Sequence, residues 1–239
     1  MLSLRRCAVS SSDTFQDFVE VLKLEGYKRY HIHHPFHRLM VEGKLTPGQI
    51  RAWVVNRFYY QRILPMKDAA IISNCPFPEV RRIWIKRILN HDNYGIEMWI
   101  KLGEAVGLSR SDLLEGAVLP GVKLACDAYL DFCKNRSWLE GIASSLTTLV
   151  APNAHMERLE HMRKHYEWIK PNGFEYFEWR LKEGPEDSHM ALNILKEYIK
   201  TEDEKERCIE ALIFKTAVLW NMLDALYMEY VINGRRDYE

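Results

Sequence analysis

The sequence has no excess of either charge, because 33 lysines and arginines balance 33 aspartates and glutamates. Proteins that bind nucleic acids or membrane surfaces usually carry a basic excess, so neither partner is expected. No apolar run is long enough for a transmembrane helix, and polar residues at 10–13 stand where a signal peptide would need an apolar segment. An anion-binding site must therefore be a local cluster of cations within a neutral protein.

Cysteines are few and scattered, and no two of the five form a CxxC pair. Their spacing predicts neither a zinc site nor a disulfide framework, and it favours reduced thiols in a cytoplasmic protein. The sequence also has no GxGxxG, P-loop or GxSxG motif. Dinucleotide-binding, nucleotide-binding and serine-hydrolase functions therefore have no local support.

Apolar side chains make up 47% of the residues and recur with helical rather than strand periodicity. This pattern predicts an all-α protein, a single compact bundle of about seven to nine helices. Residues 1–239 are expected to form one domain, with 1–12 as a flexible N-terminus. The first helix is expected to begin after a cap at 11–13 and to end near residue 26. Other helices are predicted at 35–43, 50–62, 78–90, 96–106, 109–114, 120–134, 138–150, 154–168, 174–182, 187–199 and 203–231. Pro65 is expected to kink or restart the helix before it, and a turn at 93–95 and Gly184-Pro185 are expected to interrupt the helices.

Several polar side chains lie at i, i+4 spacing within apolar helical segments, which places each pair on one helix face. The pairs are Arg57 with Gln61, Arg87 with His91, and Tyr176 with Arg180. Lys215 stands alone among apolar neighbours, where an unpaired lysine is costly to bury. Together these residues indicate an inward cluster of cations that suits a substrate with several carboxylates, with a histidine available as a base.

Each of these residues also has a simpler interpretation. The arginines can be surface side chains that extend to solvent or join salt bridges. His91 precedes Asp92 near a predicted helix end, where a protonated histidine would complement the helix dipole. Lys215 fits a surface position least, because its neighbours on both sides are typical of a buried helix.

Histidines gather in two segments. The first, at 31–37, resembles a metal site, but Pro35 breaks any continuous helix and no carboxylate or cysteine stands at ligand spacing, so no metal is expected. The second segment carries His155, His161 and His165 on one predicted helix, among charged neighbours that include Arg158. That composition favours a solvated charged face over half of a metal site.

A series of segments forms a recognisable pattern between about residues 15 and 230. The most specific is WVVNRFYYQRILPMKDAAI at 53–71. The others are YHIHHPFH at 30–37, RILNHD at 87–92, LGEAVGL at 102–108, LPGV at 119–122, ASSLT at 143–147 and HYEWIK at 165–170. Taken in this order, the segments resemble the pyrroloquinoline quinone synthase family.

The resemblance implies a haem-oxygenase-like helical fold, a homodimer and an activity. The family closes the second nitrogen ring of a bicyclic amino-dioxo-hexahydroquinoline polycarboxylate and oxidises the product with molecular oxygen, which releases hydrogen peroxide. It uses no metal and no organic cofactor. Such chemistry is feasible because the substrate is itself a quinone, and deprotonation at carbon gives an electron-rich anion that can reduce oxygen directly.

Carried over position by position, the resemblance assigns His91 as the catalytic base and His155, Tyr176 and Arg180 as the groups around oxygen. The residues that it assigns to substrate binding are Tyr30, His31, Arg57, Gln61, Lys67, Arg87, Tyr129, Thr147, Arg158 and Lys215. For His155 and Arg158, this assignment conflicts with the solvated face predicted from composition.

The chain departs from the family pattern at three points. Thr148 stands where the family usually has a glutamate, so one carboxylate that would face the substrate is missing. Only Asn93 and Tyr94 separate the His91-Asp92 pair from Gly95, where the family usually has a longer loop rich in glycine and acidic residues. The C-terminal segment is also shorter than usual.

Three other functions fit the same scaffold. A metal-dependent oxidase would need carboxylates and histidines that converge from three helices. A thiaminase-like hydrolase would need a cysteine nucleophile, for which Cys126 and Cys133 on one predicted helix are the candidates. A non-catalytic protein that binds the quinone is the third alternative, and the loss of the family glutamate at Thr148 favours it.

Overall fold

The computed structural model describes residues 14–238, and these residues form helices with no strand among them. The α-helices are α1 (Phe15–Lys28), α2 (Pro35–Val41), α3 (Pro47–Asn74), α4 (Pro78–Asn90), α5 (Ile96–Ala105), α6 (Arg110–Glu115), α7 (Pro120–Asn135), α8 (Trp138–Ala143), α9 (Thr147–Val150), α10 (Ala154–His165), α11 (Glu175–Tyr198) and α12 (Glu202–Leu226). Short 3-10 helices cover His31–His33 and Pro171–Phe174, and π-helical segments cover His91–Gly95 and Tyr227–Ile232. The all-α prediction is confirmed, with more helices than expected because several are very short. The N-terminal segment predicted to be flexible lies outside the described residues.

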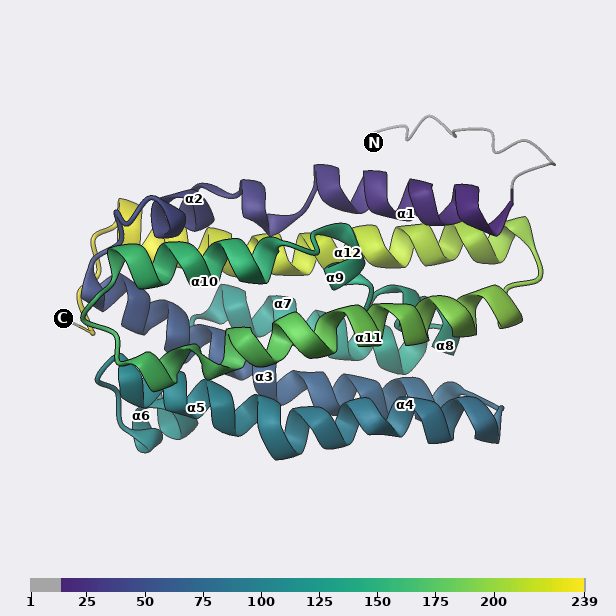
Figure 1. Ribbon diagram of the computed structural model, residues 1–239, viewed down its shortest axis with the longest axis horizontal. Helices are drawn as coiled ribbons and strands as arrows, with labels where there is room; N and C mark the ends of the chain where they lie inside the picture. The colour runs from purple at the N-terminus through teal and green to yellow at the C-terminus, as the bar shows by residue number, and fades with distance from the viewer. Residues whose placement is uncertain (1–13, 239) are drawn as a thin grey trace.

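The long helices run along one common axis and pack side by side (Figure 1). α3 contacts α4, α5 and α7, and α12 contacts α1, α7 and α8. α10 and α11 contact each other and cross the face nearest the viewer (Figure 1). Buried apolar side chains from these helices form one continuous hydrophobic core. Within residues 14–238, no helix combines the length and hydropathy that crossing a bilayer requires.

The helix break predicted at Gly184-Pro185 is wrong, and α3 does not restart at Pro65. Pro65 lies inside α3 and Pro185 lies inside α11, and both helices continue through them. Each proline removes one backbone N–H donor, a cost of about 3 kcal/mol in a helix interior. Burial of long apolar stretches on both sides offsets this cost in α3, where Pro65 itself is buried.

The turn predicted at 93–95 is also wrong, because a π-helical turn over His91–Gly95 joins α4 directly to α5. No loop separates the two helices, so His91 sits within a nearly continuous helix. Single π turns inside α-helices are rare and are found frequently at functional sites.

Capping boxes begin five of the helices, where a threonine or serine side chain accepts from the backbone N–H of the third helical residue. The first of these caps is Thr14, one residue beyond the predicted cap at 11–13, which lies outside the described residues. The single helix predicted at 138–150 is two helices, α8 and α9. The Ser144 hydroxyl donates to the Gly141 carbonyl oxygen at 2.6 Å, a local bond that competes with continuation of the helix.

Candidate active site

A cavity of about 90 Å³ lies between the helices, lined by side chains from α2, α3, α4, α7, α9, α10, α11 and α12. Thirteen of the fourteen residues that the sequence assigned to the site line this cavity. They are Tyr30, His31, Arg57, Lys67, Arg87, His91, Tyr129, Thr147, His155, Arg158, Tyr176, Arg180 and Lys215. The structure therefore brings together residues from distant parts of the chain, as the resemblance implied.

Gln61 is the exception. It is 1% exposed, yet it is not among the residues that line the cavity. Neither its amide nitrogen nor its amide oxygen has a hydrogen-bond partner among the described residues. Its i, i+4 spacing from Arg57 therefore does not place both side chains on the cavity.

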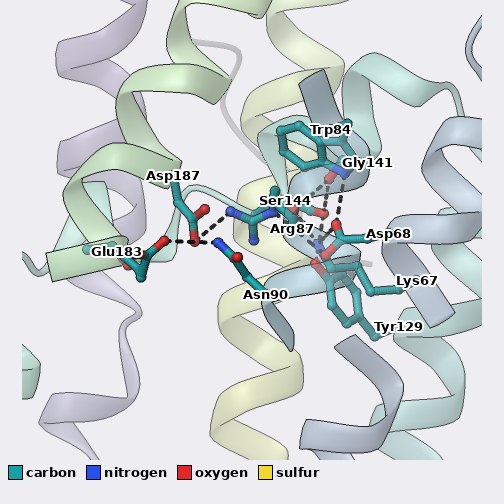
Figure 2. Close-up of polar contacts among 12 residues, drawn as sticks. Lys67, Asp68, Trp84, Arg87, Asn90, Tyr129, Gly141, Ser144, Glu183 and Asp187 are labelled. Atoms are coloured by element: carbon teal, nitrogen blue, oxygen red, sulfur yellow. Dashed lines mark hydrogen bonds and ion pairs between the residues drawn. The ribbon is translucent and has the colours of Figure 1, made fainter. Parts of the chain in front are cut away.

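Five charged side chains alternate in sign along one side of the cavity, in the order Lys67, Asp68, Arg87, Asp187 and Arg180. Figure 2 shows the first four of them. Lys67 Nζ lies 2.6 Å from Asp68 Oδ1, and Arg87 Nε lies 3.7 Å from Asp68 Oδ2. Asp187 Oδ2 then accepts from Arg87 Nη1 at 2.8 Å and from Arg180 Nη1 at 3.0 Å. The three cations line the cavity and the two acids do not, so the acids stand behind the cations that face a ligand.

Polar side chains complete both ends of this row. Lys67 Nζ donates to Ser145 Oγ at 2.6 Å, and Trp84 Nε1 donates to Asp68 Oδ1 at 2.9 Å. At the other end, Arg180 Nη2 donates to Thr148 Oγ1 at 3.4 Å. Thr148, at the position of the missing family glutamate, therefore lines the cavity as a neutral partner of an arginine.

His91 is buried at the edge of this charged wall, with its ring edge-on to Trp179 at a centroid distance of 6.1 Å. Burial lowers the pKa of His91 well below its usual value, and the positive charges of Arg87 and Arg180 lower it further. The imidazole is therefore neutral at neutral pH and able to accept a proton. It does not carry the charge that a helix-dipole role would need.

Arg158 is buried and has no carboxylate partner in the part of the chain that the structure describes. Its Nη2 lies 3.2 Å from His31 Nε2 and 3.3 Å from His37 Nδ1. Because an arginine can only donate, both histidine nitrogens act as acceptors and both rings are held neutral. Burial and the charge of Arg158 lower the pKa of His37 to about 2, which agrees with this arrangement.

The solvated face predicted for the helix of Arg158 is wrong for part of it. Arg158 is buried and His155 is half-buried, and both line the cavity. Glu157 and Glu160 on the opposite side of α10 are exposed, as expected. Composition could not separate the two sides, because charged residues occupy both of them.

Two more cations face aromatic rings and no acid. The Arg57 guanidinium lies 3.9 Å from the ring centroid of Tyr60, and Arg57 Nη1 has no hydrogen-bond partner among the described residues. Lys215 Nζ donates to the Tyr60 hydroxyl and lies 3.6 Å from the ring centroid of Tyr129. Burial lowers the pKa of Lys215 well below its usual value, with the charge of Lys67 acting in the same direction.

Two of the groups assigned to oxygen, Tyr176 and His155, lie near aromatic rings, whereas the third, Arg180, belongs to the charged wall. The Tyr176 ring packs edge-on against Trp99 at 4.8 Å, and the His155 ring lies 6.4 Å from Phe177. His155 Nδ1 is buried and has no hydrogen-bond partner among the described residues. Beside Tyr176 and His155, a small apolar molecule such as oxygen would meet aromatic surfaces.

Sequence reasoning missed several residues that organise the cavity. Asp68 follows Lys67 directly in the sequence. This position next to a residue assigned to the site was the only indication that Asp68 belongs to it. Asp187 was assigned to a separate helix beyond a supposed break at 184–185, which hid its spacing of seven residues from Arg180. His37 and Tyr60 also line the cavity, and both stand inside segments quoted for the resemblance.

Neither candidate cysteine fits a nucleophilic role. Cys126 and Cys133 are buried and do not line the cavity. Burial raises the pKa of Cys126 to about 12, so its thiol stays protonated. Among residues 14–238, no three or more His, Cys, Asp or Glu side chains are grouped so as to hold a metal ion. Independence from metals stays a prediction.

Comparison with solved structures defines the class of fold. A domain of unknown function with a haem oxygenase-like fold from Shewanella denitrificans superposes with a TM-score of 0.79 over 94% of this chain and 96% of that one, at 14% identity. A TenA homologue from Pseudomonas syringae pv. tomato superposes with a TM-score of 0.69 over 89% and 92% of the two chains, at 15% identity. The bundle is therefore a haem-oxygenase-like fold.

Sequence comparison gives the family. The model of the TENA/THI-4/PQQC family matches residues 22–225. The pyrroloquinoline-quinone synthase of Cronobacter sakazakii is 49% identical over 226 residues, which cover 92% of this chain and 90% of the relative. That of Pseudomonas aeruginosa is 50% identical over 220 residues, which cover 90% and 88%. The chain belongs to the pyrroloquinoline-quinone synthase family.

Proposed function

We propose that the protein catalyses the last step of pyrroloquinoline quinone formation, the ring closure and oxidation of the amino-dioxo-hexahydroquinoline polycarboxylate precursor by molecular oxygen. The observation that carries this proposal is the composition of one cavity wall: cations with and without acid partners surround a neutral buried histidine. Arg57, Arg158 and Lys215 face no carboxylate among the described residues, and they are therefore available to carboxylates of a substrate.

His91 is the proposed base, and the bound substrate tunes it. Arg87 and Arg180 disfavour protonation of the free imidazole. Substrate carboxylates near these arginines offset their positive field, so they raise the pKa of His91 towards neutrality. A base with a pKa near the working pH is the most effective in proton transfer, and the substrate thus prepares the residue that deprotonates it.

The oxidation needs electrons from the substrate only. Ring closure adds the substrate amine to an electrophilic carbon of the quinone ring, and the C–N bond forms as the N–H proton passes to a base, with no change of oxidation state. Each later loss of a proton from carbon gives a quinol, whose two electrons and two protons pass to one oxygen molecule and give hydrogen peroxide and the quinone. This two-electron step repeats until the reduced rings are aromatic. His155, Tyr176 and Arg180 are the proposed surroundings of oxygen, where the arginine charge stabilises reduced, anionic oxygen. No metal or organic cofactor takes part in the proposed steps.

The proposal is tested by mixing purified protein with the precursor in air, with a chelator and with metal content measured on the same sample. We expect product absorbance, oxygen uptake and peroxide release, none of which should appear under argon. Turnover that requires stoichiometric iron would overturn the proposal in favour of a metal-dependent oxidase. Tight binding of the precursor without turnover would favour a non-catalytic quinone-binding protein.

Gly95→Ala is expected to lower turnover about tenfold without loss of stability. An added Cβ would lie 3.2 Å from His91 Nδ1 and 3.5 Å from the Trp179 ring, so the imidazole must shift by a few tenths of an ångström. Gly95 has ordinary helical backbone angles, so alanine itself favours the helix by about 0.5–1 kcal/mol. Turnover and thermal unfolding are measured together. Full activity would show that the ring position tolerates the methyl group.

We also propose a cytoplasmic homodimer. Light scattering on purified protein at micromolar concentration tests the oligomeric state. A mass near twice the chain's 28.2 kDa would support the dimer, and a mass near 28.2 kDa would refute it.

A further inference from the structure

Asp187 occupies a position that no sequence signal assigned. It lies on α11 with its side chain 13% exposed, and it does not line the cavity. One of its oxygens, Oδ2, accepts from Nη1 of Arg87 on α4 and from Nη1 of Arg180 on its own helix. A single carboxylate oxygen therefore links two cavity-lining guanidinium groups that come from two different helices.

The two arginines would repel each other without this link. Both are largely buried, with side-chain exposures of 7% and 11%, so solvent screens their repulsion weakly. Arg87 has one other acid within reach, Asp68, at the longer distance of 3.7 Å. The other hydrogen-bond partner of Arg180 among the described residues is the Thr148 hydroxyl, which is neutral. Asp187 is thus the acidic partner of Arg180, and it lies closer to Arg87 than Asp68 does.

We propose that Asp187 is a positioning residue that sets the distance and orientation between Arg87, which faces the substrate, and Arg180, which faces oxygen. The inference rests on the proposed function, because it concerns the two sides of the proposed reaction. Asp187 touches neither substrate nor oxygen. It acts through the two arginines, and it keeps both of them aligned on the ring that is oxidised.

Charge balance predicts how the loss of Asp187 appears in kinetics. Lys67, Arg87 and Arg180 with the two acids carry a net charge of one positive unit, and neutral Asp187 would leave two. Greater positive charge does not weaken the attraction of an anionic ligand. Misplaced arginines, in contrast, reduce interactions that matter in the transition state. The expected signature is a loss of kcat with retained affinity.

The test compares Asp187→Asn, Asp187→Glu and the matched control Glu183→Gln. Glu183 lies one helical turn before Asp187 and also links α11 to α4, by accepting from Asn90 Nδ2 at 3.0 Å (Figure 2). Unlike Asp187, it forms no ion pair with Arg87 or Arg180. Asp187→Asn should lower kcat at least tenfold while the Kd for pyrroloquinoline quinone stays within threefold of the parent. Asp187→Glu restores the charge and should recover part of kcat. Glu183→Gln should stay within twofold of the parent in both quantities.

Parental kcat in Asp187→Asn would overturn the proposal. Equal losses of kcat in Asp187→Asn and Glu183→Gln, each accompanied by an equal fall in melting temperature, would also overturn it. Asp187 would then only help to hold α11 against α4. If the parent chain itself forms no product, the proposed function fails. The positioning role is then decided by crystal structures of parent and Asp187→Asn: unchanged guanidinium positions refute it, and separated guanidinium groups support it.

Discussion

Replacement of His91 by alanine is expected to lower turnover by a factor of about 10²–10⁴ while the affinity for pyrroloquinoline quinone changes little. His91 is a neutral imidazole beside the arginines of the charged wall, and the cations that bind carboxylates are other residues. The variant removes a proton acceptor and leaves the binding groups in place. Loss of kcat without loss of binding is the pattern of a group that acts in the transition state.

Stopped-flow mixing with the precursor under argon and then in air separates the two stages. We expect His91→Ala to bind the precursor and to consume no oxygen on the parent's timescale. His189→Ala, which removes an exposed histidine on α11, serves as the control and should behave as the parent. If His91→Ala turns over at the parental rate, His91 is not the base.

The pH dependence gives a second signature of the same role. In the free protein, burial and then Arg87 and Arg180 hold the pKa of His91 well below its usual value. Bound carboxylates raise it, so the acid limb of kcat should lie at a higher pH than the acid limb of kcat/KM. Each limb reports the loss of activity as His91 becomes protonated, in the free protein for kcat/KM and in the substrate complex for kcat. A kcat limb at the lower pH would contradict the proposed tuning by substrate.

The helical bundle was predictable from the sequence because helical periodicity and capping residues act locally. Breaks were less predictable: Pro65 and Pro185 both lie within helices, since the packing of the flanking turns outweighs one lost backbone hydrogen bond. The π turn at His91–Gly95 was missed for a related reason. Asn93, Tyr94 and Gly95 are typical turn residues, and only tertiary contacts hold them in a helix.

For the candidate site, too, local features of the sequence were predictive and contacts between distant segments were not. The i, i+4 spacing indicated Arg57, Arg87, His91, Tyr176 and Arg180, which line the cavity, and the resemblance added most of the others. Both lines of reasoning assigned Gln61, which does not line the cavity. The acids behind the cavity could not be found from spacing. Asp187 contacts Arg87 across a hundred residues of chain, and nothing local in either segment indicates that contact. Ion pairs between helices are a product of packing, so they appear only in the folded protein.

The two buried lysines of the cavity are expected to affect stability in opposite directions when each is replaced by methionine. Lys215 faces aromatic rings and a tyrosine hydroxyl and has no acid partner within residues 14–238, so its charge is costly to bury. Lys215→Met should stabilise the free protein by on the order of 1–3 kcal/mol. Lys67 pairs with Asp68 at 2.6 Å, so Lys67→Met leaves a buried carboxylate short of its closest cation. That variant should lose on the order of 3 kcal/mol.

Melting temperatures measured as a function of pH test both signs, at about 2–4 °C for each kcal/mol in a chain of this size. Because the pKa of Lys215 is depressed by burial, the unfolded chain binds its proton more tightly than the folded protein does. The penalty from Lys215 is therefore largest at neutral and lower pH and shrinks as pH rises towards the unfolded value of about 10.4. The gain in stability from Lys215→Met should shrink with it.

The same variant should bind pyrroloquinoline quinone about tenfold more weakly, because it loses a charge-assisted hydrogen bond to a carboxylate. A variant that melts earlier and binds normally would show that Lys215 stabilises the fold, and that the cavity gains its affinity from Arg57 and Arg158 without it.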